Sequence, residues 1–312
     1  MRTLVVGAGG IGGYFGGRMV EAGRDVTFLV RPRRAEHLAK TGLVIKSQHG
    51  DFHTPTPKLV LARDLREPFD LVLLSCKAYD LDDAIESFAP AVGPSTAILP
   101  TLNGIRHIDV LAERFGADAV LGGLAFISST MDDEGRILHL NPHHLLVFGE
   151  RNGARSARIQ EIAAELATAN FESRLSEVIV QDMWEKWVFI ATGAGITSMM
   201  RAGVGDIEAA GGAPLASKLL DECAATAAAA GYAPSDESVA SARTIFTTPG
   251  SALKASMLRD IERGGRTECE HLLGDLLRRG PFVDRTDSLL RAAYVHVAAY
   301  ELTRAQAVVQ KV

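Results

Sequence analysis

The sequence predicts an α/β domain built on a parallel sheet, followed by an all-helical domain. Apolar runs typical of buried parallel strands lie at residues 70–75 and 97–100, and further strand patterns continue up to Phe148. A glycine-rich turn separates the apolar run 3–6 from a helical pattern, and beyond Glu177 only alanine-rich helical patterns follow. We therefore expect one domain over residues 1–175 and a helical domain for substrate binding or dimerisation over residues 176–312.

The first turn carries the pattern G-x-G-x-x-G directly after the apolar run 3–6. In such a loop Gly7 allows a tight turn, Gly9 lets a pyrophosphate approach the backbone, and Gly12 lets the helix pack on the strand. The helix N-terminus offers N–H groups and a positive dipole end to phosphates. We predict a Rossmann-like, dinucleotide-binding domain; a purely structural turn is the alternative. The expected cofactor contacts are Gly7, Ala8, Gly9, Gly10, Ile11 and Gly12.

The end of the second predicted strand, residues 25–30, indicates which dinucleotide binds. An acidic residue there would suit the ribose 2′-hydroxyl of NAD, whereas arginine can pair with the 2′-phosphate of NADP. The chain has arginine at positions 31, 33 and 34 and no acidic residue until Glu36. We expect NADP(H), with Arg31 at the 2′-phosphate. A solvated helix start, or tolerance of both cofactors, is the alternative.

The other N-terminal elements follow in chain order. Short strands are predicted at residues 43–46, 50–52 and 58–61, and buried parallel strands at 70–75 and 97–100. Residues 119–123 and 124–128 are expected to continue this sheet. Residues 136–140 and 144–148 predict an antiparallel pair around a turn at Asn141-Pro142, with His143-His144 facing solvent, and a helix over 154–168 closes the domain.

The helical domain is predicted from apolar residues at helical spacing. Its helices cover residues 182–190, 213–230, 235–246, 252–263, 269–279 and 286–306. In the first of them Lys186 stands between Trp184 and Trp187. Burial there would lower the lysine pKa and prepare it to give up a proton near neutral pH. An ordinary surface lysine is an equal alternative.

Two further candidates come from strand ends, where open α/β sheets bind ligands. Lys77 and Asn103 each follow a predicted parallel strand, and Ser128 is a further expected cofactor contact. We expect them near the cofactor. The alternatives are a helix-capping lysine and an ordinary Asn-Gly turn.

Composition excludes several classes of function. A net charge of -5, 47% hydrophobic and 23% charged residues argue for a soluble globular protein without a nucleic-acid or membrane partner. No apolar run approaches the roughly 18 residues that span a bilayer, and no signal peptide is legible. The three cysteines are widely spaced, which is typical of free thiols in a reducing cytosol, so we expect a cytoplasmic protein. No histidine has metal-ligand spacing, so no metal site is expected.

Together these motifs resemble the ketopantoate reductase (2-dehydropantoate 2-reductase) family. The matching pieces are Gly7 to Gly12, Arg31, Cys76-Lys77-Ala78, Asn103-Gly104, Trp184-Glu185-Lys186, Ser256 to Asp260 and Thr267-Glu268. The resemblance implies a Rossmann domain plus a helical domain. It also implies an oxidoreductase that uses NADPH to reduce a 2-oxo acid to a 2-hydroxy acid, with 2-dehydropantoate, an intermediate of pantothenate biosynthesis, as the expected substrate.

The resemblance also implies residue roles. Lys186 matches the catalytic lysine that polarises the ketone and supplies the proton to the new hydroxyl. Lys77, Asn103 and Glu268 match residues around the ribose and nicotinamide, and Ser256 matches a serine that helps to bind substrate.

The chain departs from the family after that lysine. Pantoate-forming members have asparagines one and two helical turns later, where this chain has Ile190 and Ala194, and another near Val204. The asparagines bind the hydroxyls and carboxylate of pantoate, so aliphatic replacements favour a less hydroxylated, more apolar 2-oxo acid. Such a substrate is one alternative, and a non-catalytic NADP(H)-binding sensor is another. We expect Lys186, Ile190, Ala194 and Ser256 to line the substrate site, and the C-terminal helices suggest a homodimer.

Overall fold

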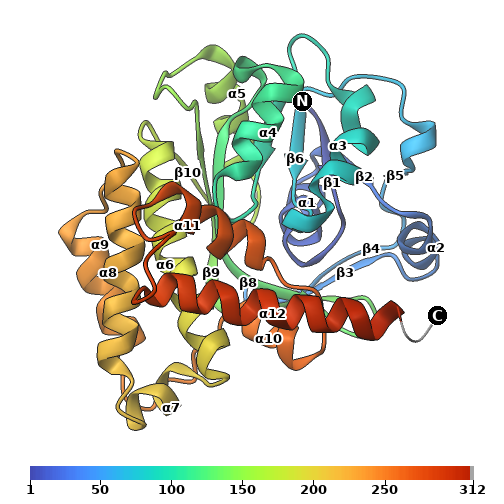
Figure 1. Cartoon of the computed structure of the whole chain (residues 1–312). Helices are drawn as coiled ribbons and strands as arrows, with labels where there is room; N and C mark the ends of the chain where they lie inside the picture. The colour runs from blue at the N-terminus through green and yellow to red at the C-terminus, as the bar shows by residue number, and fades with distance from the viewer. Residues whose placement is uncertain (310–312) are drawn as a thin grey trace. The chain divides into compact units, whose positions relative to one another are not determined.

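The computed structural model describes residues 1–309, which form two compact units (Figure 1). The first unit consists of Met1–Leu102 and His107–Val180, and the second contains the described residues from 181 to 309. The second unit also includes the loop Asn103–Arg106, although the chain on both sides of this loop belongs to the first unit.

The first unit is built on a parallel sheet in the order β5-β2-β1-β6-β7. Its strands are β1 (Arg2–Val6), β2 (Asp25–Leu29), β5 (Leu59–Val60), β6 (Leu71–Leu74) and β7 (Ala97–Pro100). Every residue of β6 and β7 is buried, as their uninterrupted apolar sequence predicts. The helices of this unit are α1 (Gly10–Glu21), α2 (Pro32–Thr41), α3 (Leu81–Phe88), α4 (Arg106–Phe115) and α5 (Ala157–Leu166). The predicted Rossmann-like architecture is confirmed.

A second sheet has the order β10-β9-β3-β4, and β8 pairs with β9. Its strands are β3 (Leu43–Lys46), β4 (Phe52–Thr54), β8 (Gly122–Met131), β9 (Ile137–Gly149) and β10 (Glu172–Leu175). The expectation that residues 119–128 continue the parallel sheet is therefore wrong. Among residues 1–309, the β-pairing of this segment with the strand β7 is limited to an isolated parallel bridge between Ile98 and Val120.

The antiparallel pair predicted around Asn141-Pro142 is also wrong, because both halves belong to the single strand β9. The ladder between β8 and β9 shifts register between Ile127 and Ser129, opposite this segment. The backbone N–H of Ser128 there donates to Asn141 Oδ1 at 2.7 Å. A bulge with a side-chain acceptor accommodates Pro142, which cannot donate to a ladder, without ending the strand.

His144 is buried, contrary to the expectation that it faces solvent. Its Nδ1 lies 2.8 Å from Tyr14 Oη, and its ring stacks on that of His49 with centroids 3.8 Å apart. Burial, with the neighbouring His49, His139 and Arg18, lowers the pKa of His144 to about 4. The ring is therefore a neutral core residue at neutral pH.

The second unit is helical. It contains α6 (Ile179–Met200, of which the first two residues belong to the first unit), α7 (Val204–Ala209), α8 (Ala213–Ala229), α9 (Asp236–Phe246), α10 (Ser256–Glu262), the π-helix η5 (Glu270–Gly274), α11 (Asp275–Arg279) and α12 (Leu289–Val309). The helix α6 is longer than the predicted 182–190. Thr192 and Thr197 bond their hydroxyls to carbonyls of the same helix. A Cβ at Gly193 or Gly195 would lie 2.9 Å from Phe246 or Leu219, so these glycines serve close helix packing.

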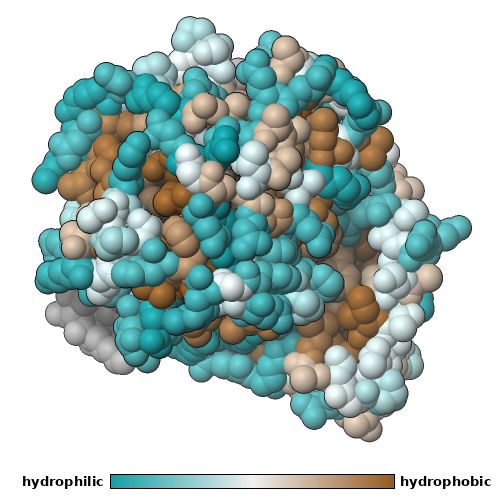
Figure 2. Space-filling view, turned by 180° about the vertical axis from the view of Figure 1, so that it is seen from behind, coloured by the Kyte–Doolittle hydropathy of each residue, from teal (hydrophilic) through white to brown (hydrophobic). Residues whose placement is uncertain are grey.

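The face shown in Figure 2 is mainly hydrophilic, with apolar residues exposed in groups among polar ones. Within residues 1–309, no helix is long and apolar enough to cross a membrane.

Candidate active site

The glycine-rich loop forms a cradle at the end of β1. Gly7 has φ +95°, a conformation that favours glycine, and a Cβ at Gly12 would lie 2.0 Å from Ser75 Oγ and 2.2 Å from the Gly7 carbonyl oxygen. A Cβ at Gly9 would instead meet no atom of the described chain within 4 Å. Glycine is thus required at position 7 by the backbone conformation and at position 12 by close packing within the protein, whereas the space beside Gly9 is open. This geometry fits a bound pyrophosphate at the N-terminus of α1, next to Ala8, Gly10 and Ile11.

Arg31 lies at the N-cap of α2, two residues after the end of β2. Its side chain is 70% exposed, and its guanidinium lies 3.2 Å from the Asp80 carboxylate. An exposed, charged fork at this point fits a ribose 2′-phosphate.

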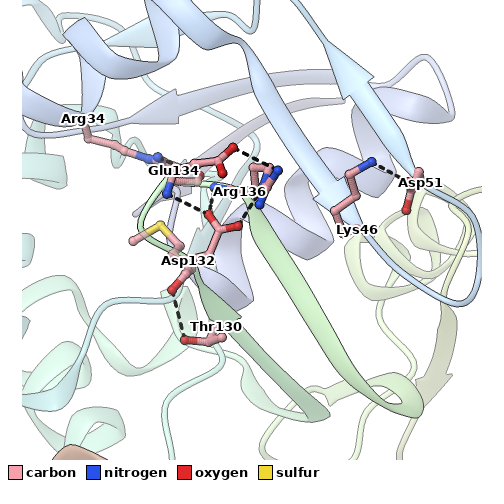
Figure 3. Close-up of polar contacts among 9 residues, drawn as sticks. Arg34, Lys46, Asp51, Thr130, Asp132, Glu134 and Arg136 are labelled. Carbon is pink, nitrogen blue, oxygen red and sulfur yellow. Dashed lines mark hydrogen bonds and ion pairs between the residues drawn. The ribbon is translucent and has the colours of Figure 1, made fainter. Parts of the chain in front are cut away.

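Arg34 is a residue that the sequence prediction left aside, and the structure turns it toward the glycine-rich loop. Its Nε donates to the Ala8 carbonyl at 3.2 Å, and one terminal nitrogen donates to the Gly135 carbonyl at 3.1 Å. Figure 3 shows the side chain reaching the turn that also carries Asp132, Glu134 and Arg136. Arg34 therefore fixes the loop against the turn between β8 and β9. Only its run of neighbouring arginines signalled it in the sequence.

Lys77 and Ser128 also lie in the first unit. Lys77 is exposed and precedes the short 3₁₀ turn Ala78–Asp80, at the carboxyl end of β6. Ser128 is half-buried at the bulge of β8, where its backbone N–H is already bonded to Asn141. Lys77 stands where a parallel sheet binds ligands, as the sequence predicts.

Lys186 is buried in the second unit, with 9% of its surface exposed. On the same helix Trp184 stacks on Tyr232, and Trp187 is fully buried. This burial lowers the pKa of Lys186 to about 7, and the Glu268 carboxylate opposes the shift. The structure thus brings Lys186 and Glu268 within electrostatic reach, and the lysine exchanges its proton near neutral pH.

Three candidate substrate contacts lie on α6 and α10. Ile190 and Ala194 follow Lys186 by one and two helical turns, so they share its face of α6. Ile190 is half-buried and Ala194 is buried, which gives this face an apolar continuation. Ser256 is exposed as the first residue of α10.

Asn103 is half-buried in the loop that belongs to the second unit. Its carbonyl oxygen lies 2.6 Å from Nε2 of the buried His271. No motif in the sequence pointed to His271, because a single histidine in a helical pattern carries no recognisable spacing.

Two family models match the chain. The model described as "Ketopantoate reductase PanE/ApbA" matches residues 3–153, and the model described as "Ketopantoate reductase PanE/ApbA C terminal" matches residues 178–301.

The chain is also similar in sequence to known proteins and in structure to solved ones. The "Uncharacterized oxidoreductase YkpB" of Bacillus subtilis is 41% identical over 304 residues, which cover 96% of this chain and 99% of the relative. The 2-dehydropantoate 2-reductase of Halobacterium salinarum is 27% identical, covering 89% and 92%. The crystal structure of 2-dehydropantoate 2-reductase from Geobacter metallireducens has a TM-score of 0.87 at 29% identity, covering 96% and 99%. The chain belongs to the ketopantoate reductase family, whose members are NADPH-dependent oxidoreductases.

Proposed function

We propose that this protein reduces 2-dehydropantoate (ketopantoate) to pantoate, and that Lys186 supplies the proton. The observation that supports this function is the burial of Lys186 beside Glu268, which brings the lysine pKa to about 7. A lysine with that pKa is an efficient general acid at neutral pH, whereas an ordinary lysine holds its proton too tightly. The non-catalytic sensor considered from the sequence is not retained, since the family consists of oxidoreductases.

Each group has a defined part in this reaction. Bound NADPH supplies the hydride that the carbonyl carbon accepts. The Lys186 ammonium polarises the carbonyl oxygen, offsets the developing alkoxide and then transfers one proton to it, which leaves a neutral amine and a hydroxyl. Solvent returns a proton to the amine. The negative charge of Glu268 favours the ammonium and so keeps a protonated fraction available.

We assign the cofactor to the cradle Gly7–Gly12, with Arg31 at the 2′-phosphate and Lys77, Ser128, Asn103 and Glu268 as further contacts. The open space at Gly9 and the exposed guanidinium of Arg31 support this assignment. Ser256 is the proposed additional contact of the substrate. We also infer a homodimer, which light scattering of the purified protein tests.

A second candidate function is the same reduction on a more apolar 2-oxo acid. Ile190 and Ala194 favour it, because neither side chain can bond a hydroxyl, and a site without such groups does not select hydroxylated substrates. The chemistry at Lys186 is the same for both candidates.

The experiment follows NADPH oxidation with ketopantoate and a panel of branched and aromatic 2-oxo acids. Lys186→Ala is expected to lose about a hundredfold or more of the activity, while Lys40→Ala, at an exposed position, serves as the matched control. Highest activity on ketopantoate supports the first candidate, and highest activity on an unhydroxylated acid supports the second. A wild-type protein that binds NADPH but turns over none of the acids would refute both.

A further inference from the structure

The loop Asn103-Gly104 rests on the imidazole of His271. Besides the 2.6 Å contact between His271 Nε2 and the Asn103 carbonyl oxygen, Gly104 lies against the ring. Gly104 has φ +78°, and a Cβ there would be 3.1 Å from Nε2 and 3.2 Å from Cδ2 of the histidine. The backbone of the loop therefore contacts the ring directly, and only glycine permits this approach.

His271 lies on the π-helix Glu270–Gly274, which starts two residues after Glu268. The Nε1–H of Trp187, the neighbour of Lys186, donates to the Leu272 carbonyl in the same turn at 3.0 Å. This one turn is thus linked to the lysine helix by Leu272 and to the asparagine loop by His271, and it starts two residues after Glu268. Wide helical turns of this kind recur at functional sites.

The chemistry of the contact defines the state of the histidine. A carbonyl oxygen only accepts hydrogen bonds, so Nε2 carries a hydrogen and donates. Burial lowers the pKa of His271, as Arg106 also does, while Glu268, Asp275 and the Asn103 carbonyl oppose the shift. The ring is therefore neutral at neutral pH, and its role is to donate this hydrogen bond.

We propose that His271 is a positioning residue of the reductase site, which holds the Asn103 loop in register with Lys186 and Glu268. The proposal rests on the proposed function, because Asn103 and Glu268 are cofactor contacts there. Displacement of a reacting group by about 1 Å reduces rates by about a hundredfold. A single hydrogen bond that sets this loop is thus expected to affect the reaction strongly, although His271 does not itself take part in proton transfer.

The test compares His271→Leu, which fills similar volume without a donor, with His271→Gln, whose amide N–H can replace Nε2–H. His296→Leu, at an exposed position of α12, is the matched control. Three readouts are taken for each variant: the NADPH Kd from fluorescence, kcat and KM with NADPH and ketopantoate or the best 2-oxo acid, and the thermal unfolding midpoint.

We expect His271→Leu to weaken NADPH binding and to lower kcat/KM by about 10- to 100-fold. His271→Gln should recover both to within about threefold, since the hydrogen bond is restored. Wild-type values in His271→Leu would overturn the proposal. So would a folded His271→Gln that is as impaired as His271→Leu, because the donated hydrogen bond would then not be the relevant property.

The two hypotheses fail in different ways. If the wild type turns over no 2-oxo acid, the proposed function fails, and the NADPH Kd of the His271 variants still tests the positioning role. If Lys186→Ala abolishes turnover while His271→Leu matches the wild type in NADPH Kd and kcat/KM, only the positioning role fails. If His271→Leu does not fold, the Kd and kcat/KM of His271→Gln decide: near-wild-type values support the role, and a loss beyond tenfold overturns it.

Discussion

Substrate choice is expected to change when an asparagine replaces Ile190. Position 190 lies one turn beyond Lys186 on the same face of α6 and is half-buried, so a smaller polar side chain can be accommodated there. Ala194 is 2% exposed. An asparagine at 194 would overpack a buried position at a cost of about 1–3 kcal/mol in stability. We therefore choose Ile190→Asn to test substrate choice.

The size of the effect follows from one hydrogen bond. A hydroxyl–amide hydrogen bond contributes about 0.5–1.5 kcal/mol net, or roughly 2- to 12-fold in an equilibrium or rate ratio. The relevant quantity is kcat/KM for ketopantoate divided by kcat/KM for the analogue that lacks only its hydroxyl. We expect Ile190→Asn to raise this ratio by about 2- to 12-fold.

The assay measures NADPH oxidation at 340 nm with each acid, using Ile190→Val as the control. Valine shortens the side chain without adding a donor, so it should leave the ratio unchanged. A folded Ile190→Asn whose ratio stays at the wild-type value or falls would refute the placement of residue 190 at the substrate hydroxyl.

Three further predictions concern the cofactor cradle and the buried lysine. Arg31→Ala should raise the Kd for NADPH by about 10- to 100-fold, as expected for a lost charge-assisted hydrogen bond, and leave the Kd for NADH unchanged; an equal loss in the exposed control Arg33→Ala would contradict a specific role. Gly12→Ala should lower the unfolding midpoint, because its Cβ would meet Ser75 Oγ at 2.0 Å, whereas Gly9→Ala should keep the midpoint and lose NADPH affinity. Lys186 is protonated in the unfolded chain up to about pH 10.4, but in the folded protein only below about pH 7. Between these two pH values the free energy of unfolding of the wild type should therefore rise by roughly 1 kcal/mol per pH unit relative to Lys186→Met. Chemical denaturation at pH 7 and pH 9 measures this difference, and parallel behaviour of the two proteins would show that Lys186 is not held neutral.

The parts of the fold that could be predicted were those set by local pattern. The strand–glycine loop–helix start and the buried strands β6 and β7 follow from sequence alone, because covered parallel strands need uninterrupted apolar runs. The strand β9 was mispredicted because Asn141-Pro142 reads locally as a turn. The Asn141 side chain instead accepts a hydrogen bond from the backbone N–H of Ser128, which lies on another strand of the second sheet. Sheet membership of this kind depends on pairing that no local pattern specifies.

In the candidate site, too, residues with a local sequence signal could be predicted and residues that act through distant contacts could not. The tryptophan neighbours of Lys186 predicted a buried lysine only as one of two equal alternatives, and the structure agrees with the buried one. His271 and Arg34 were not recognisable, since each acts on backbone carbonyls far away in sequence, at Asn103 and at Ala8 with Gly135. A contact to a backbone carbonyl requires no particular residue type at the partner position, so no sequence motif reveals it.

The pH dependence of kcat/KM for NADPH-dependent reduction of the best 2-oxo acid tests most directly whether Lys186 is the proton donor. This quantity reports the ionisation of the free enzyme. With a Lys186 pKa of about 7, we expect kcat/KM to be constant at low pH and to fall about tenfold per unit above pH 7, to roughly 1% at pH 9. In Lys186→Ala the residual activity should lose this dependence. A wild-type profile that stays flat to pH 9, or a fall near pH 7 that persists in Lys186→Ala, would contradict the assignment.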